Sequence, residues 1–152
     1  MKIRRVSALG LIVLLFGLST SFAQDFDYTA YPKLDFTFEE LQLDLEINPE
    51  EGSIDGRANY RAEANINGVD SLIFQAAHME IRSVQVEGSD SGFNLRNDSL
   101  IVSLEEPLEA GESLELSIDY ITIPRFGVLK NNRNTFWSSH LPLSNRHWFP
   151  AI

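Results

Sequence analysis

The chain is predicted to be an all-β protein, an antiparallel β-sandwich or saddle-shaped pair of sheets that follows an N-terminal signal peptide. Apolar and polar residues alternate along several stretches, and this period of about two residues is typical of half-buried strands. Turn residues recur about every ten residues, as in sandwich domains. No stretch after the signal peptide keeps a period of about 3.6 residues, so no helix is predicted.

The first 23 residues have the features of a signal peptide. Three basic residues precede an apolar run, Ala8 to Leu18, and Ser21-Phe22-Ala23 fits a cleavage site with small residues. The apolar run is shorter than the roughly 20 residues of a bilayer-spanning helix. This favours a cleaved signal over an uncleaved anchor. We therefore expect a mature chain that begins at Gln24, is periplasmic or secreted, and has no membrane contact after cleavage.

Charge and cysteine content exclude several classes of protein. The net charge is −10, and cleavage would remove Lys2, Arg4 and Arg5 without removing any acidic residue. Such a negative chain without a basic cluster repels nucleic acid and anionic lipid. The chain has no cysteine, which excludes disulfides, cysteine zinc sites, thiol catalysis and lipid attachment through a thiol.

The first strands follow a loose lead-in over residues 24–35. In FTFEELQLDLEINP one face carries four aliphatic residues and the other carries acidic and amide residues. The aliphatic residues, expected to be half-buried, are Leu41, Leu43, Leu45 and Ile47. The next stretch, GSIDGRANYRAEAN, alternates in the same way. Its expected inner face is Ile54, Ala58, Tyr60, Ala62 and Ala64.

The remaining strands are separated by turn signals. Asn67-Gly68 predicts a tight hairpin turn, and the runs SLIF and MEIRSVQVEG follow it. In the second run Ile81 and Val84 are out of step, which predicts a bulge. Two further alternating strands, SLIVSL and SLELSIDY, flank the turn PLEAGE.

No catalytic constellation is evident in the chain. The histidines are His78, His140 and His147, and they lack the H-E-x-x-H spacing of zinc hydrolases. Ser139 beside His140 is a weak candidate for a nucleophile and base. The acidic pairs, such as Glu105-Glu106, are interpreted as solvated edges because neighbours on a strand point to opposite faces. Asn97-Asp98-Ser99 fits a glycosylation sequon but is interpreted as a turn before a strand.

Aromatic residues gather in the C-terminal third. They are Phe126, Phe136, Trp137, Trp148 and Phe149. Such residues could form a platform on which sugars stack, but core and interface roles are the favoured interpretation.

The order of these elements resembles the N-terminal domain of zinc aminopeptidases of the aminopeptidase N family. The most specific pieces are PLEAGESLELSIDY and RHWFPAI. They match that family's strand pair and the R-x-x-F/L-P motif that follows it some tens of residues later. The resemblance covers residues 36–152. It implies a saddle-shaped β domain that packs over a thermolysin-like catalytic domain, whose zinc ligands would lie after the end of this chain.

The resemblance also implies roles for residues near the C-terminal end. Arg146 matches the family's Arg four residues before Pro150, and together with Trp148 and Phe149 these residues would contact the absent catalytic domain. Many family members carry Gln or Glu nine residues before this Pro, where it holds the substrate's amino group. That position is Leu141 here, which cannot accept a hydrogen bond. Either the parent enzyme belongs to a divergent branch or the anchor comes from elsewhere.

Three hypotheses follow for function. The first is a non-catalytic N-terminal domain, cut at the domain junction, of an exported zinc aminopeptidase-like protein. Its partner would be the catalytic domain, it would meet peptide substrate only through that domain, and it would hold no cofactor itself. The positions nearest the substrate would be Ser139, His140 and Leu141. The second hypothesis is a stand-alone exported binding module for carbohydrate or protein. The third is a small hydrolase that uses Ser139 and His140.

Overall fold

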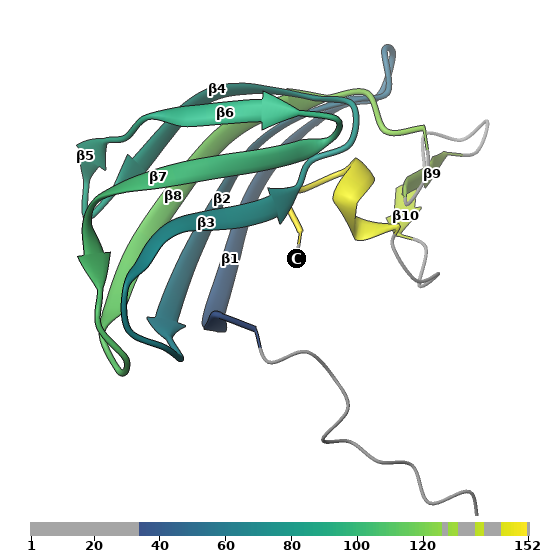
Figure 1. Cartoon of the computed structure of the whole chain (residues 1–152). Helices are drawn as coiled ribbons and strands as arrows, with labels where there is room; N and C mark the ends of the chain where they lie inside the picture. The colour runs from purple at the N-terminus through teal and green to yellow at the C-terminus, as the bar shows by residue number, and fades with distance from the viewer. Residues whose placement is uncertain (1–33, 126–127, 131–135, 139–143, 152) are drawn as a thin grey trace, which may run out of the picture. The chain divides into compact units, whose positions relative to one another are not determined.

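The computed structural model describes residues 34–125, 128–130, 136–138 and 144–151. The described domain is a sandwich of two antiparallel sheets, with the smaller sheet lying over the larger one (Figure 1). The larger sheet contains, in order across it, β1 (Phe36–Asn48), β2 (Ser53–Ala64), β8 (Ser113–Thr122), β4 (Met79–Val86) and β5 (Ser89–Asp90). The smaller sheet contains β3 (Val69–Gln75), β7 (Ser99–Leu108) and β6 (Phe93–Arg96). The all-β prediction is confirmed.

Three short elements complete the described chain. Strands β9 (Val128–Lys130) and β10 (Phe136–Ser138) pair with each other, and a 3₁₀-helix, η2, spans Asn145–His147. No helix within the described ranges is long and apolar enough to cross a bilayer. The predicted signal peptide and most of the predicted lead-in lie outside the described residues.

The predicted inner face of β2 is confirmed. Ala58, Tyr60, Ala62 and Ala64 are all buried, whereas Arg61 between them is exposed. Strand β2 lies between β1 and β8 and pairs with both along its length. Its central position explains why the alternation in its sequence translates so directly into burial.

Strand β1 departs from the prediction. Leu41, Leu45 and Ile47 are 41%, 38% and 38% exposed, although the pairing places them on the inner face, opposite Tyr60, Gly56 and Ile54 of β2. The physical reason is that the facing sheet is too narrow to cover β1, because β1 is the edge strand of a five-stranded sheet and the facing sheet has only three strands. The inner face of β1 is therefore only partly covered. Leu43 is half-buried and packs against the core, as predicted, whereas the other three aliphatic side chains remain exposed.

The turns differ from the prediction in the strands that they connect. The predicted turn at Asn67-Gly68 is present, but it links β2 to β3 in different sheets, so the predicted hairpin is wrong. The two-residue hairpin turns lie elsewhere, at Glu87-Gly88 and Asn97-Asp98. All four of these residues have positive φ, which suits the twist of such hairpins. The bulge predicted in β4 is confirmed by a register shift between Ile81 and Ser83.

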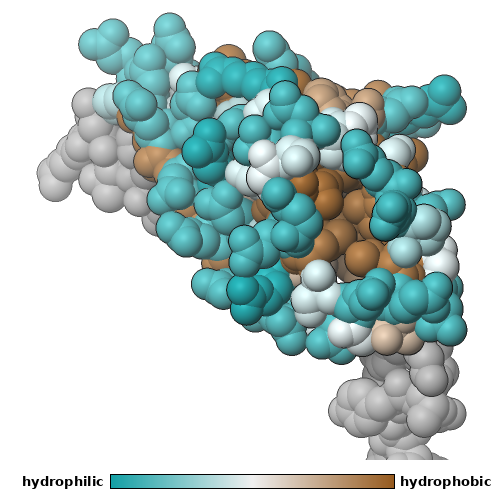
Figure 2. Space-filling view, turned by 90° about the vertical axis from the view of Figure 1, so that its left-hand side faces the viewer, coloured by the Kyte–Doolittle hydropathy of each residue, from teal (hydrophilic) through white to brown (hydrophobic). Residues whose placement is uncertain are grey.

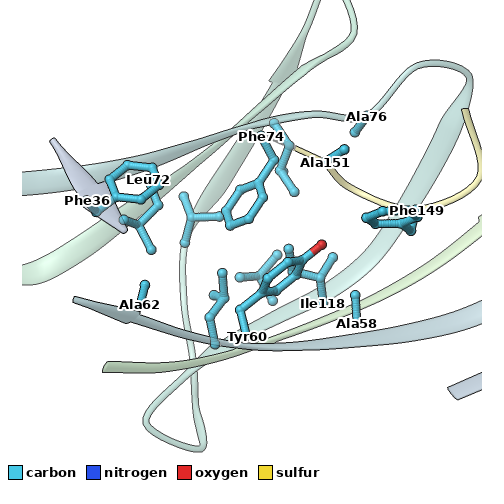
Figure 3. Close-up of a cluster of buried hydrophobic side chains, with 14 of the residues drawn as sticks. Phe36, Ala58, Tyr60, Ala62, Leu72, Phe74, Ala76, Ile118, Phe149 and Ala151 are labelled. Atoms are coloured by element: carbon cyan, nitrogen blue, oxygen red, sulfur yellow. The ribbon is translucent and has the colours of Figure 1, made fainter. Parts of the chain in front are cut away.

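Both sheets contribute to one core (Figure 3). Tyr60 from the larger sheet and Phe74 from the smaller sheet meet with ring centroids 5.1 Å apart. Phe38 contacts both rings, at 5.2 Å and 5.3 Å. Phe149 and Ala151, from the C-terminal segment, belong to the same cluster. The core thus joins the two sheets to the last described residues of the chain.

Candidate functional site

The C-terminal segment, residues 144–151, contains η2 and joins the smaller sheet through a single β-bridge at Ala151. After η2, Ala151 bonds to Gln75 at the end of β3, with N–H···O distances of 2.5 and 2.8 Å in the two directions. The amide of Ala77 donates to the carbonyl of Arg146 at 2.8 Å. Figure 1 shows this segment running beside the end of β3. It is thereby fixed to the smaller sheet.

Hydroxyl groups of the larger sheet hold the other side of the segment. The Tyr60 hydroxyl donates to the carbonyl of Pro150, and that of Tyr120 donates to the carbonyl of Trp148 at 2.9 Å. The Thr122 hydroxyl lies 3.3 Å from the carbonyl of His147. Burial raises the pKa of both tyrosines well above the ordinary value, so both remain protonated donors at neutral pH.

Gly56 provides the space that Tyr120 needs. A Cβ atom added at Gly56 would lie 2.5 Å from Cζ and 2.6 Å from the hydroxyl oxygen of Tyr120. Residue 120 is fully buried, and residue 56 lies directly opposite it on the neighbouring strand. The absence of a side chain at position 56 thus allows the ring to lie flat on β2 and reach the C-terminal segment.

The predicted contact residues of this segment divide into two groups. Phe149 and Pro150 are buried in the core of this domain itself, whereas Arg146 and Trp148 are half-buried. Two donor atoms, Arg146 Nε and Trp148 Nε1, are buried without a hydrogen-bond acceptor in the described part of the chain. Buried donors normally have acceptors, so this pair points to a group supplied from outside the described residues. Contact with another domain stays a prediction.

A partly apolar pocket lies beside Arg146, and we call it the Arg146 pocket. Its volume is about 300 Å³. Its lining consists of Phe38, Leu41, Tyr60, Gln75, Asn145, Arg146, Phe149 and Ala151. Leu41 joins the pocket to the exposed row of β1. The surface around the C-terminal segment therefore combines exposed aliphatic side chains with donors that lack acceptors.

The histidines do not form a metal centre in the described residues. His78 and His147 stack with ring centroids 5.7 Å apart, and no group of three His, Cys, Asp or Glu side chains is placed to hold an ion there. Burial lowers the pKa of His147, and the neighbouring Arg146 and His78 lower it further. The other candidate positions, Ser139, His140 and Leu141, lie outside the described residues.

Sequence reasoning missed the two tyrosines and the glycine that hold the C-terminal segment. The alternation places Tyr60 and Tyr120 on inner faces, as the structure confirms. Nothing in the sequence connects their hydroxyls to carbonyls at positions 150 and 148, which are 90 and 28 residues away. The available signal was that two inward tyrosines each need a partner for a buried hydroxyl.

Comparison with solved structures shows that the fold is similar to part of several longer proteins. No family model and no curated protein sequence matches the chain. The M1 zinc metallopeptidase of Deinococcus radiodurans superposes with a TM-score of 0.70 at 17% identity, over 77% of this chain and 29% of that chain. Yeast LTA4 hydrolase gives 0.63 at 19% identity, over 77% and 20%. Legionella pneumophila aminopeptidase A gives 0.67 at 14% identity, over 81% and 15%.

This similarity extends to the fold and no further. Most of this chain matches, but it spans less than a third of the length of each of these structures. The likeness is that expected of one β domain of such proteins, and it confirms the fold that the sequence resemblance implied. Each of these solved structures is more than three times as long as the part of it that matches this chain.

Proposed function

We propose that this chain is the non-catalytic N-terminal domain of an exported zinc aminopeptidase-like protein. In this proposal it packs on a thermolysin-like catalytic domain and shapes the entrance to its substrate site. The observation that carries it is the surface around the C-terminal segment, on a domain whose fold is shared with part of several M1 metallopeptidases. In this proposal zinc chemistry belongs to the catalytic domain; in the described part of this chain no group of three His, Cys, Asp or Glu side chains is placed to hold a metal ion.

The proposed contact surface has the composition of a domain interface. Leu41 lines the Arg146 pocket, and Leu45 and Ile47 are exposed further along the same face of β1. Adjoining apolar groups of this kind mark surfaces that bind another protein. Trp and Arg, here Trp148 and Arg146, are the residue types that carry most binding energy in interfaces. Inter-domain interfaces of one chain follow the same rules as those between proteins.

Charge pairing distinguishes Arg146 from three other arginines of the domain. Arg57, Arg61 and Arg82 each lie within 2.6 to 2.9 Å of a carboxylate on the outer face of the larger sheet. Arg146 has no ion pair within the described part of the chain, and its Nε is buried. We infer that the partner domain supplies an acceptor, a carboxylate or a backbone carbonyl, to Arg146 and another to Trp148. Such a group would satisfy donors that are otherwise costly to bury.

The first test concerns activity and the coding sequence. The purified chain should release no product from aminoacyl anilides above the blank, with or without zinc. The coding sequence past Ile152 should continue in frame to an H-E-x-x-H motif, and the longer product should hydrolyse the same substrates only with zinc. A stop codon directly after Ile152 would overturn the proposal and favour the stand-alone binding module.

The second test concerns the packing surface. In the longer product, Trp148→Ala and Arg146→Ala should each raise hydrophobic-dye binding and the rate of proteolysis between the two domains. Arg96→Ala is the matched control, because Arg96 is an exposed arginine at the end of β6 and should leave both readouts unchanged. Equal effects of Arg96→Ala and Arg146→Ala would show that the surface around the C-terminal segment is not the interface.

A further inference from the structure

A second cleft opens between the two sheets, at the β4–β5 turn and the β7–β8 end of the sandwich. Figure 1 places β5 and this end of β7 on the side away from η2. The cleft has a volume of about 320 Å³, at the lower end of the range in which small-molecule sites are found. It shares no lining residue with the Arg146 pocket, so it does not depend on the proposed packing surface.

The floor of this cleft is aliphatic. It consists of Val86 from β4, Leu104 and Leu108 from β7, and Leu114 from β8. The first three are half-buried and pack against the core, and Leu114 is buried. The floor is therefore the open side of the core itself. Figure 2 shows this side of the molecule, with a hydrophobic area surrounded by hydrophilic residues.

The rim of the cleft is acidic. Glu87, Asp90, Glu105 and Glu106 line it, together with three serines, and no basic residue does. Glu87 accepts a hydrogen bond from the amide of Glu115 at 2.6 Å, and Asp90 accepts one from the Gln85 side chain at 3.1 Å. No described residue forms an ion pair or a side-chain hydrogen bond with Glu105 or Glu106. Two carboxylates at the rim are thus available to a ligand.

Glu105 and Glu106 both line the cleft although they are neighbours in β7, and the pairing of this part of β7 is irregular. The pairing of β3 with β7 passes from Ser71↔Ser103 to Val69↔Leu108, so four residues of β7 lie opposite the single residue Asp70. The expectation that Glu105 and Glu106 would point to opposite faces assumed a regular strand. At this bulge the strand bends and twists, and both residues line the cleft.

We propose that this cleft binds a primary ammonium group carried on an unbranched aliphatic stem. The four aliphatic side chains of the floor would contact the stem, and Glu105 and Glu106 would face the ammonium. Charge complementarity selects this chemistry, because a cation with an apolar stem satisfies both parts of the cleft at once. An anion with the same stem would meet four carboxylates. The ammonium can belong to a free alkylamine or to a lysine side chain.

Titration of the isotope-labelled full chain with hexylammonium tests the proposal by amide NMR shifts. Saturable shifts should appear at residues 86–91, 104–106, 108 and 113–114. Hexanoate, which has the same stem length with the opposite charge, should cause none. Raising NaCl from about 20 to about 300 mM should weaken binding, since the rim is exposed and screened by salt. Nα-acetyl-lysine methylamide identifies the source: tighter binding than hexylammonium indicates a lysine side chain, and weaker binding indicates a free amine.

Two double variants distinguish the carboxylates of the rim from the general negative charge of the domain. One exposed ion pair changes affinity by roughly 1.4- to 5-fold, so Glu105→Gln/Glu106→Gln should weaken hexylammonium binding by about 2- to 25-fold. Glu39→Gln/Glu40→Gln removes two adjacent carboxylates from β1, outside this cleft, and should leave binding unchanged. Both pairs are exposed, so all variants should fold normally. Equal binding of hexanoate, an equal effect of the two double variants, or no saturable shift would overturn the proposal.

Discussion

Gly56→Ala should destabilise the domain although it adds only one methyl group. The new Cβ would lie 2.5 Å from Cζ of Tyr120, far inside van der Waals contact. The Tyr120 ring cannot move away freely, because it is fully buried and its hydroxyl donates to the carbonyl of Trp148. The clash must therefore shift the ring, the strand or the C-terminal segment.

The magnitude follows from three contributions. Forcing an extra methyl into a packed core costs about 1–3 kcal/mol. Loss of the bond from Tyr120 to the Trp148 carbonyl costs about 0.5–1.5 kcal/mol. Replacing glycine by alanine inside a strand returns about 0.5–1 kcal/mol. The expected loss in the free energy of unfolding is therefore about 2 kcal/mol.

Urea unfolding followed by circular dichroism measures this loss. A control variant and a double-mutant cycle test whether the clash with Tyr120 causes it. Gly92→Ala is the matched control, because Gly92 has open space around it and no positive φ, so its change should stay within about 0.5 kcal/mol. In a double-mutant cycle, Tyr120→Leu should relieve the clash, so the double variant should be more stable than additivity predicts by at least about 1 kcal/mol. Additive effects of Gly56→Ala and Tyr120→Leu would refute the steric argument.

Three further predictions concern other parts of the domain. Leu100→Ala in β7 removes a fully buried side chain and should cost about 2–5 kcal/mol in urea unfolding, and a loss below about 1 kcal/mol would contradict the burial. The hydrogen bond from Arg57 holds the pKa of Asp119 below its ordinary value, so the stability advantage over Asp119→Asn should be present above about pH 4 and vanish as the pH falls through the lower folded-state pKa. Burial lowers the pKa of His147, so on acidification His147 takes up its proton in the unfolded chain before it does so in the folded chain. The free energy of unfolding should therefore decline below about pH 6.5 in the parent, and decline less in His147→Gln. Unfolding curves across the pH range check both signs, and parallel curves for parent and variant would contradict them.

Much of the strand arrangement could be predicted because alternation is a local property. In the central strands β2 and β8 the residues of the inner face are buried, as their spacing predicts. The bulge in β4 was also visible, because Ile81 and Val84 break the period. In these strands both faces have fixed surroundings, so local pattern and tertiary environment agree.

The candidate site was predicted only in part, because its groups come from distant parts of the chain. The motif RHWFPAI marked the segment that contains Arg146 and Trp148. Its sequence could not show that Phe149 would be buried in the core of this domain, or that two tyrosine hydroxyls would hold its backbone. These contacts exist because the segment enters between two sheets, and no local pattern specifies that position.

Alternation and composition were enough to predict the all-β class, most strand positions, the inner faces of the central strands, the absence of thiol chemistry and the resemblance to one domain of zinc aminopeptidases. Which inner faces are covered depends on how the two sheets pack together. The aliphatic row of β1 alternates as regularly as that of β2, yet three of its four side chains are exposed because the facing sheet is narrower. Likewise, the neighbours Glu105 and Glu106 both line one cleft, at a place where the pairing of β7 is irregular. Alternation specifies the face to which a side chain points, whereas burial depends on what the rest of the chain places opposite that face.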